Sequence, residues 1–400
     1  MKILVVCQYY YPEPFRITDI CESLVDQGHD VTILTGLPNY PEGVILKEYR
    51  KGKKRLEVRN GVKIIRCFEI GRGKSKLKLF LNYFSYAISA SVKTYTLPEK
   101  YDVIFVNQLS PVMMGLPAIL HKMKNKTKVL LYCLDLWPDS LAAGGIKQNS
   151  FIYRIFFHIS KFIYKKCDSI LVTSKMFKSY FIDNFKVDNK IINHLPQYAE
   201  DLFNRDEKEM ILEVMAKDTT DFVFAGNIGD MQSVDTIIKA AKLVAKVNQI
   251  KIHIIGDGSN LEYCKKISTA LNTQNVVFYG RKPVEEMPKY YDIADAMLIT
   301  LKDNEILSMT LPGKIQSYMA AGKPIIGAIN GETNNLINEA KCGLVCDAED
   351  EESLAKLMIE FHESSDKVQM GINSKEYYVK NFSKQIFISK LNHELKSLEA

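Results

Sequence analysis

The sequence predicts an α/β protein made of two doubly wound domains in tandem. Short apolar runs alternate with longer amphipathic segments throughout the 400 residues. Such runs indicate parallel strands that helices cover on both faces. The alternation pauses at 192–209, where Pro196 and several charges indicate a crossing between domains. We therefore expect domains at 1–197 and 198–375, and a C-terminal helix over 376–400 that could pack back on the first domain.

The first half contains both kinds of run, and they mostly alternate. Gly28 ends the first expected helix and Pro98 ends a long one, because neither residue favours continuation of a helix. The expected strands lie at 2–7, 31–35, 62–68, 102–107, 128–134 and 169–173, and the expected helices at 18–27, 77–97, 113–124 and 151–167.

The second half repeats the pattern. The expected strands lie at 221–225, 250–255, 276–279 and 296–300. The expected helices lie at 234–247, 352–363 and 374–398, and a further one follows GDGSN and ends at Leu271. Ligands of doubly wound sheets bind beyond the carboxyl ends of the strands. If the two domains face each other, the cleft between them is the expected site.

The segment 311–327, LPGKIQSYMAAGKPIIG, reads as a loop, a short helix and a buried strand. Pro312 and Gly313 mark the entry, and Gly322 ends the helix. Lys314 falls in the first turn, where the helix dipole favours anions rather than cations. A free helix N-terminus beside a lysine is a candidate anion site.

Composition points to an ordinary globular protein of the cytosol. Apolar residues make up 46% and charged residues 25% of the chain. The start is not that of a signal peptide, and no apolar run approaches the roughly 18 residues of a membrane span. The eight cysteines are scattered without zinc-site spacing, which favours reduced, buried thiols. We expect no metal and no other cofactor.

The stretch from Lys47 to Lys78 carries thirteen basic residues against three glutamates. An aromatic and apolar run follows directly at 79–92. This combination predicts contact with an anionic membrane surface. No nucleic-acid-binding motif accompanies it, so nucleic acid is not an expected partner. The alternative is a solvated face followed by a core helix.

Glycines and cations follow several strands of the second half. The loop 226–229 offers backbone N–H groups to a phosphate. Arg281 suits a bidentate phosphate contact, and Lys282 and Lys314 suit point-charge contacts. The loop that begins at Gly256 contains G-x-G without the full dinucleotide fingerprint, so a NAD-dependent dehydrogenase is not favoured.

Three strand-end loops of the first half carry candidate acceptor residues. Asp135 directly follows a strand and is the expected catalytic carboxylate, which would deprotonate or orient a hydroxyl. Asp139, together with Ser140, is expected to cap the next helix. The other candidates are Glu13, Phe15, Arg16, Gln108 and Ser110.

Together these segments resemble the GT-B glycosyltransferases of glycosyltransferase family 4. The resemblance covers essentially the whole length and rests on the first 43 residues, DLWPDSL, CDSILVTS, FAGNIGDMQSVDTIIKAA, IIGDGSN, VVFYGRKPVEEMP and LPGKIQSYMAAGKPIIG. LPNYPEG, DLWPDS and PGKIQSYMAAGKP are similar to bacterial N-acetyl-L-fucosamine transferases of capsule and O-antigen pathways. The resemblance implies two Rossmann-like domains facing across a cleft, a UDP-sugar donor, an undecaprenyl-diphosphate-linked acceptor and a retaining reaction without a metal.

The chain departs from the family pattern at several donor-site positions. The family's usual Glu-x7-Glu pair falls on Met309 and Ser317, and its usual Arg and Lys after the first strand of the second domain fall on Asn227 and Gln232. Glu13-Pro14-Phe15-Arg16 stands where a glycine pair is common. Charge for the diphosphate is therefore expected from the remaining cations. The expected donor-binding residues are Asn227, Gly229, Gly256, Gly280, Arg281, Lys282, Leu311, Pro312, Gly313, Lys314 and Ser317.

The expected function is transfer of an N-acetylated deoxy-amino sugar from UDP to a lipid-linked sugar at the cytoplasmic face of the plasma membrane. The acceptor domain would be the first and the donor domain the second. Two alternatives stay open: a UDP-sugar epimerase of the same fold, and a non-catalytic partner subunit that binds a UDP-sugar. The missing glutamate pair keeps the second alternative open.

Overall fold

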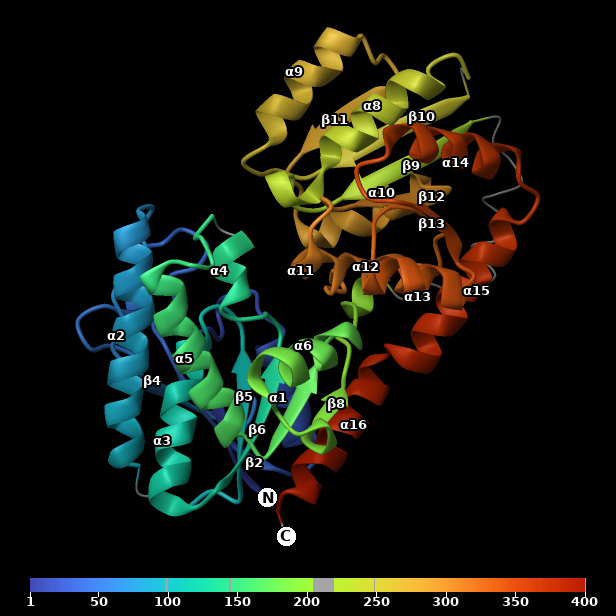
Figure 1. The fold of residues 1–400 in the computed structure, drawn as a ribbon. Helices are drawn as coiled ribbons and strands as arrows, with labels where there is room; N and C mark the ends of the chain where they lie inside the picture. Colours follow the sequence, from blue (N-terminus) through green and yellow to red (C-terminus); the bar gives the residue numbers. More distant parts are fainter. Residues whose placement is uncertain (98–99, 144, 204–218, 248, 400) are drawn as a thin grey trace. The chain divides into compact units, whose positions relative to one another are not determined.

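The computed structural model describes residues 1–97, 100–143, 145–203, 219–247 and 249–399. The chain forms two compact units. The first comprises residues 1–195 and the end of the chain from Ile388, and the second runs from Pro196 to Phe387. Each unit is a parallel sheet with helices on both faces (Figure 1), so the predicted pair of Rossmann-like domains is confirmed.

In the described part of the first unit, eight strands follow the order β3-β4-β2-β1-β5-β6-β7-β8, and all but β3 are parallel. The strands are β1 (Lys2–Val6), β2 (Asp30–Thr35), β3 (Leu56–Arg59), β4 (Val62–Arg66), β5 (Val103–Gln108), β6 (Lys128–Cys133), β7 (Ser169–Val172) and β8 (Ile192–His194). The helices are α1 (Ile17–Asp26), α2 (Lys76–Tyr95), α3 (Leu116–Asn125), α4 (Asp139–Ala143), α5 (Phe151–Lys166) and α6 (Met176–Phe185).

The β3–β4 hairpin was not predicted, although its turn carries a clear signal. Asn60 and Gly61 connect the strands with φ angles of 46° and 78°. Asn-Gly is the dipeptide that favours such two-residue turns. The residues before this turn are rich in lysine and arginine, so they lack the apolar run by which the other strands were predicted.

The described residues of the second unit form a six-stranded parallel sheet in the order β11-β10-β9-β12-β13-β14. The strands are β9 (Thr220–Ala225), β10 (Ile250–Ile255), β11 (Val276–Gly280), β12 (Ala296–Thr300), β13 (Ile325–Ala328) and β14 (Gly343–Cys346). The helices are α8 (Val234–Val244), α9 (Leu261–Leu271), α10 (Met287–Ile293), α11 (Glu305–Ser308), α12 (Lys314–Ala320), α13 (Glu332–Ala340), α14 (Glu351–Glu363) and α15 (Lys367–Asn381).

Alternate residues of the second sheet enter two different cores. Val223 and Met297 pack with α12 on one face, whereas Phe222 and Leu298 pack with α8 and α14 on the other. Because the central strands are mostly buried on both sides, they are largely apolar, although His253 and Asp221 on neighbouring strands pair at 2.8 Å. This burial explains why the second half could be divided into strands from the sequence.

The end of the chain forms two helices, so the single helix expected over 374–398 is wrong. Helix α15 ends at Asn381, and α16 (Lys384–Ser397) begins after Ser383, whose hydroxyl accepts the N–H of Ile386 at 3.4 Å. Phe382 between them is buried, so its packing turns the chain there. Asn392 of α16 meets the ring of His29 at 2.8 Å, and Glu394 accepts from Asn193 at 3.0 Å.

Tyr318 attaches α12 to the carboxyl end of β9. Its buried hydroxyl donates to the carbonyl of Ala225 at 3.0 Å and lies 3.2 Å from the N–H of the same residue. The start of α12 is therefore held against the loop that leaves β9, which brings two expected donor-site segments together.

We expect Tyr318→Phe to lower the free energy of unfolding by about 1–2 kcal/mol, because it removes the hydroxyl and leaves a buried backbone group without that partner. Urea denaturation measures the change. Tyr291→Phe is the matched control, since this buried ring makes edge contact with Tyr318 and its hydroxyl has no hydrogen bond among the described residues. Equal destabilisation by both variants would contradict the role of the Tyr318 hydroxyl.

Candidate functional site

Asp135 lies just beyond the carboxyl end of β6 and is surrounded by donors. Ser140 donates to one carboxylate oxygen, and Ser110 donates to the other. The indole N–H of Trp137 lies 3.2 Å from the Ser110-bound oxygen and 2.9 Å from the Ser110 hydroxyl. The structure therefore brings the expected catalytic carboxylate and one expected acceptor residue into direct contact, with Asp135 half-buried.

Asp139 has a different role from the expected helix cap. It is the first residue of α4, and its buried carboxylate accepts from Tyr153 at 2.6 Å, from Gln148 at 3.0 Å and from Tyr180. The prediction of a cap was wrong because the Asp139 carboxylate binds tyrosine hydroxyls from α5 and α6, which are distant in sequence, instead of backbone N–H groups of its own helix. Asp139 thus fixes the loop that carries Asp135.

Tyr83 and Arg72 belong to the same edge and were missed by sequence reasoning as site residues. Burial raises the pKa of the Tyr83 hydroxyl, the charge of Arg72 opposes this rise, and the charge of Asp135 adds to it. Tyr83 therefore lies within electrostatic reach of both Arg72 and Asp135. Tyr83 is on α2, and no local motif distinguishes it from the other aromatics of that helix.

A buried carboxylate, Glu69, joins three loops of this edge. Its oxygens accept from the Gln8 amide at 2.8 Å, the Asn39 amide at 3.1 Å, the Leu37 N–H at 3.1 Å and the Asn82 amide. These partners follow β1 and β2 or lie on α2. Glu69 therefore organises the edge, although the sequence showed it only as one of three acids in a basic stretch.

Glycine at position 36 makes the approach of Glu69 possible. A Cβ placed there would lie 1.7 Å from a Glu69 oxygen. Burial raises the pKa of Glu69 from an ordinary 4.5 to about 8, opposed by the Gln8 amide and supported by the charge of Glu13. The cluster therefore holds a proton through much of the neutral range.

The remaining expected acceptor residues have mostly structural contacts. The Glu13 carboxylate accepts the N–H groups of Asn39 at 2.8 Å and Tyr40 at 2.7 Å. Gln108 is buried, and its amide donates to the Asp135 carbonyl at 2.9 Å. Phe15 stacks on Tyr9 with ring centroids 4.8 Å apart, and Arg16 directly precedes α1.

In the second unit, three glycines lie side by side at the carboxyl ends of neighbouring strands. The Gly226 N–H donates to Ile255 at 2.9 Å, and the Gly256 N–H donates to Gly280 at 3.0 Å. A Cβ on Gly256 would lie 1.8 Å from the Gly226 carbonyl oxygen. The loops after β9, β10 and β11 therefore touch through backbone, and only glycine fits at position 256.

Lys314 reaches this glycine row from α12. Its Nζ lies 3.9 Å from the centroid of the Phe224 ring and 3.0 Å from where a Cβ of Gly226 would be. Although the stem is partly exposed, Nζ is buried and has no hydrogen-bond partner among the described residues. Burial lowers the pKa of Lys314 from 10.5 to about 7. An unpaired buried amine is costly unless an anion joins it.

The other expected donor-binding residues differ in how far they are buried. Arg281 is exposed. The pKa of the Glu286 carboxyl is lowered mainly by its ion pair with Lys289 and to a smaller extent by the charge of Lys282. Asn227 donates to the Gln232 side chain at 2.9 Å, and the Gly229 N–H donates to the same oxygen at 3.1 Å. The two residues that replace the family's cations therefore bind each other. Leu311 and Ser317 are buried, whereas Pro312 is partly exposed and Gly313 exposed.

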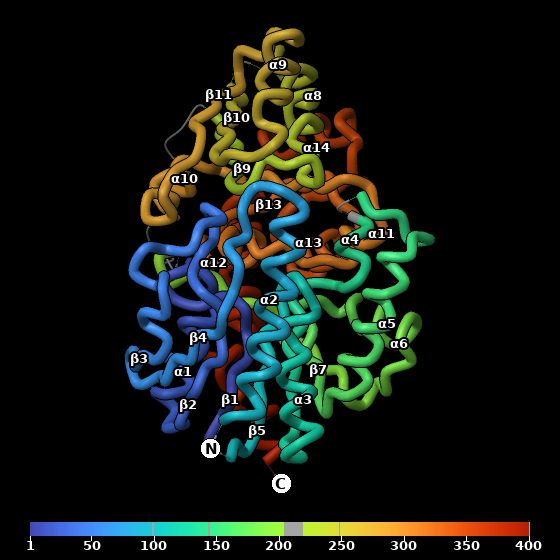
Figure 2. The backbone as a smooth tube through the Cα atoms, turned by 90° about the vertical axis from the view of Figure 1, so that its left-hand side faces the viewer, coloured from blue at the N-terminus to red at the C-terminus, as the bar shows by residue number. Residues whose placement is uncertain are grey.

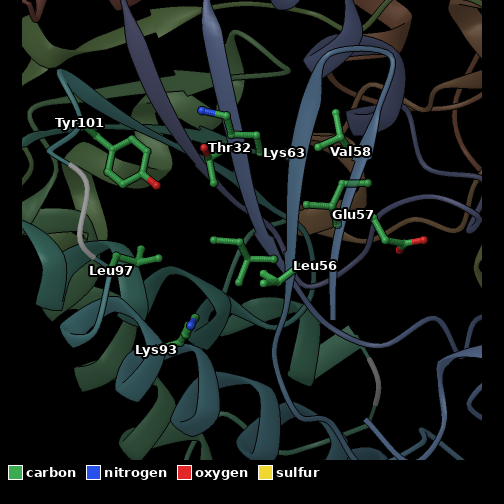
Figure 3. Close-up of a pocket in the computed structure, with 10 residues that line it drawn as sticks. Thr32, Leu56, Glu57, Val58, Lys63, Lys93, Leu97 and Tyr101 are labelled. Carbon is green, nitrogen blue, oxygen red and sulfur yellow. The ribbon is translucent and has the colours of Figure 1, made fainter. Parts of the chain in front are cut away.

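A cavity of about 490 Å³ lies elsewhere in the first unit (Figure 3). It is lined mainly by β3, β4 and the end of α2, and includes Leu56, Lys63 and Lys93. Thr32 and Tyr101 place it toward the amino ends of the strands, away from Asp135. It is therefore not the acceptor site predicted from the strand ends.

The basic stretch is partly neutralised in the folded chain. Arg59 pairs with Glu22, Lys63 with Asp30 at 3.2 Å, and the buried Arg66 with Glu57 at 3.0 Å. The free cations of this stretch are therefore fewer than the thirteen counted in the sequence. They lie mainly at its two ends, in loops before β3 and before α2.

The described part of the chain contains neither a metal-binding cluster nor a membrane-spanning helix. Among the described residues, no group of three or more His, Cys, Asp and Glu side chains could hold a metal ion. Over the same part of the chain, no helix has the length and hydropathy needed to cross a membrane. The predicted absence of a metal and of other cofactors stays a prediction.

Comparison with known proteins places both units in one enzyme class. Residues 207–377 match the glycosyl transferases group 1, and residues 16–196 match glycosyltransferase family 4. The probable glycosyltransferase WbjE of Pseudomonas aeruginosa is 26% identical over 335 residues, which cover 81% of this chain and 82% of that protein. The putative colanic acid biosynthesis glycosyl transferase WcaI of Escherichia coli K12 is 21% identical over 338 residues, covering 80% and 82%.

Solved structures share the fold over nearly the whole chain. Sucrose-phosphate synthase from Thermosynechococcus elongatus has a TM-score of 0.77 at 16% identity and covers 99% of this chain and 98% of its own. Anabaena Alr3699/HepE, solved in complex with UDP-glucose, has a TM-score of 0.70 at 14% identity and covers 99% and 100%. The chain therefore belongs to the glycosyltransferases of the group 1 and family 4 type, with the GT-B fold.

We expect stability to fall as the pH rises across the range in which Glu69 titrates. The folded-state pKa lies above that of the unfolded chain, so the folded state binds the extra proton between pH 4.5 and about 8. The free energy of unfolding should drop by roughly 1–3 kcal/mol between about pH 6 and about pH 9, and Glu69→Gln should flatten this drop. Urea denaturation at a series of pH values measures it.

Glu48→Gln serves as the control, because this half-exposed glutamate pairs with Lys54 at the surface. It should keep the pH dependence of the wild-type protein. If Glu69→Gln instead follows the wild-type curve, the proton is not held by Glu69.

Proposed function

We propose that this glycosyltransferase moves an N-acetylated deoxy-amino sugar, N-acetyl-L-fucosamine, from UDP to an undecaprenyl-diphosphate-linked sugar in capsule or O-antigen synthesis. The buried, unpartnered amine of Lys314 beside Gly226 carries the proposal, because it lacks the anion that a nucleotide diphosphate would supply. The HepE complex with UDP-glucose supports a UDP-sugar donor. The name of the WcaI relative supports a role in polysaccharide synthesis.

The second unit is the proposed donor domain. The side-chain position of Gly280 has no atom within 4 Å, and that of Gly226 meets only the end of Lys314, so a phosphate can approach the backbone where Lys314 supplies charge. Exposed Arg281 can reach a phosphate as a planar fork. Stabilising the departing diphosphate is the main electrostatic task of such a transfer. In this proposal Lys314 takes over charge that the family's usual Arg and Lys would provide, since Asn227 and Gln232 are neutral.

The first unit is the proposed acceptor domain. Asp135 accepts hydrogen bonds from Ser110 and Ser140, so the carboxylate is oriented before an acceptor arrives. Its role is to orient the acceptor hydroxyl or take its proton, and the leaving phosphate is the alternative base. Retention of anomeric configuration and independence from metal belong to the same proposal.

Incubation with a panel of UDP-sugars and short lipid-diphosphate acceptors, followed by mass spectrometry, tests the reaction itself. A glycosylated acceptor supports the proposal and identifies the sugar. A new UDP-sugar formed without acceptor identifies an epimerase instead. Binding without any product identifies a non-catalytic subunit, which Met309 and Ser317 in place of the family's glutamates would favour.

We expect UDP-glucose to bind more weakly as the pH rises above about 7, by up to tenfold per pH unit. The diphosphate needs the charged Lys314, whose pKa in the free protein is about 7, and the bound anion raises that pKa. UDP-glucose is a suitable probe because its diphosphate carries no proton that titrates in this range. Isothermal titration calorimetry at several pH values measures the affinity.

Two variants at one position separate charge from structure. Lys314→Arg stays protonated and should bind with little pH dependence, whereas Lys314→Met should lose most of the affinity. Both are first checked for a cooperative unfolding transition. Wild-type affinity in Lys314→Met would exclude this side chain from the donor site.

Asp135→Asn should lower turnover by at least about a hundredfold while UDP-sugar affinity stays unchanged, because only the acceptor step uses the carboxylate. Initial rates at saturating donor and calorimetric affinities provide the two measurements. Asp183→Asn, a change on α6, is the control for an Asn substitution in the same unit. Turnover near wild type would leave the diphosphate as the base.

A further inference from the structure

Helix α2 exposes a continuous apolar row along its length. Leu77 is 69% exposed, Ile88 61%, Val92 63% and Tyr95 58%, and Leu81 lies between them at 41%. Their spacing of three, four or seven places them on one side of the helix. The buried side of the helix carries Tyr86, which is fully buried, together with smaller groups such as Ala87 and Ala90. One side of α2 therefore enters the core, as the alternative interpretation expects, while another side exposes large apolar side chains.

Helix α5 extends this apolar surface. Phe151 is 78% exposed and Ile152 50%, and about one and three turns further along Ile155 and Phe162 are each 41% exposed. The rings of Phe84 on α2 and Phe156 on α5 lie 6.4 Å apart, so the two helices are neighbours. Figure 2 looks onto this side of the first unit and shows α2, α3 and α5 next to one another. We call this surface the α2–α5 face.

The charges of the α2–α5 face have a single sign. The sequences of α2, α3 and α5 contain no aspartate or glutamate. Their basic residues are Lys76, Lys78, Lys93, Lys122, Lys124, Arg154, Lys161, Lys165 and Lys166. Lys122 is paired with Asp168, which follows α5. Apolar rows bordered by lysine and arginine, without acids, are characteristic of surfaces that lie on anionic lipid.

A second copy of this chain fits the face poorly. Self-association would bring two surfaces of the same positive sign together, which disfavours contact. Anionic headgroups, in contrast, match the bordering cations, and the acyl boundary accepts the isoleucine, leucine and phenylalanine side chains. Large apolar side chains this exposed are also costly in water, so a lipid partner accounts for both the charge and the apolar rows.

We propose that the α2–α5 face docks on an anionic bilayer surface, with its apolar rows at the headgroup boundary and its lysines on the headgroups. This inference rests on the proposed function only in that it names the surface from which a lipid-linked acceptor would be taken. It extends the contact predicted for the basic stretch at 47–78, which shares Lys76 and Lys78 with the face and in which Arg59, Lys63 and Arg66 are ion-paired.

Flotation with phosphatidylcholine vesicles, with and without phosphatidylglycerol, tests the inference on the full chain without any sugar substrate. Wild-type protein should float only with the anionic vesicles, and less at high salt. Ile88→Ser combined with Val92→Ser should weaken binding by about tenfold or more, because both side chains leave the lipid boundary. Leu243→Ser combined with Val379→Ser is the matched control at 51% and 52% exposure in the second unit, and should bind as wild type.

Equal binding by the two double variants, or equal binding to neutral vesicles, would overturn the inference. Sedimentation velocity provides the other decisive result: a wild-type dimer that Ile88→Ser and Val92→Ser dissociate would assign the face to a second copy. The proposed function is judged separately, since transfer to a short, water-soluble acceptor should be unchanged in the Ile88 and Val92 variant. Loss of vesicle binding with retained transfer supports the inference, and lack of transfer in every protein contradicts the function alone.

Discussion

The burial of both faces of two parallel sheets is the constraint on which the rest of this structure depends. Strands enclosed in this way carry most of their polar side chains where they end, and in a parallel sheet all of them end at the same edge. Asp135 and Glu69 in the first unit, and Gly226, Gly256 and Lys314 in the second, are the consequence. Each of these residues follows a strand or packs against a loop that follows a strand. Polar and charged side chains therefore collect at one edge of each sheet, although no single long sequence motif contains them.

Both edges hold an ionisable group whose burial opposes its charge. Glu69 has four donors yet a raised pKa, because it is fully buried and close to Glu13. Lys314 has no partner among the described residues and a lowered pKa. The two cases differ in kind. The Glu69 carboxylate has hydrogen-bond donors from the protein itself and holds loops together. The Lys314 amine needs an added anion as its partner, which is the property of a binding residue rather than of a structural one.

Much of the fold was predictable because its signals are local. Uninterrupted apolar runs identified every central strand within one or two residues, and Gly28 marked the end of a helix correctly. The misses involve partners distant in sequence. Asp139 was predicted to cap a helix, but its carboxylate accepts hydrogen bonds from tyrosines of α5 and α6. The break at Phe382 depends on a ring that is buried by residues from other elements.

The sequence by itself determined the two α/β domains, the strand-end loops and the positions at which family cations and glutamates are absent. It did so because parallel strands and glycine-rich turns leave periodic, short-range patterns. Only the tertiary structure decided which of these residues meet. It paired Asn227 with Gln232, buried the amine of Lys314 over Phe224, and placed the apolar side of α2 in solvent. These outcomes depend on contacts between segments far apart in the chain, and no local pattern records them.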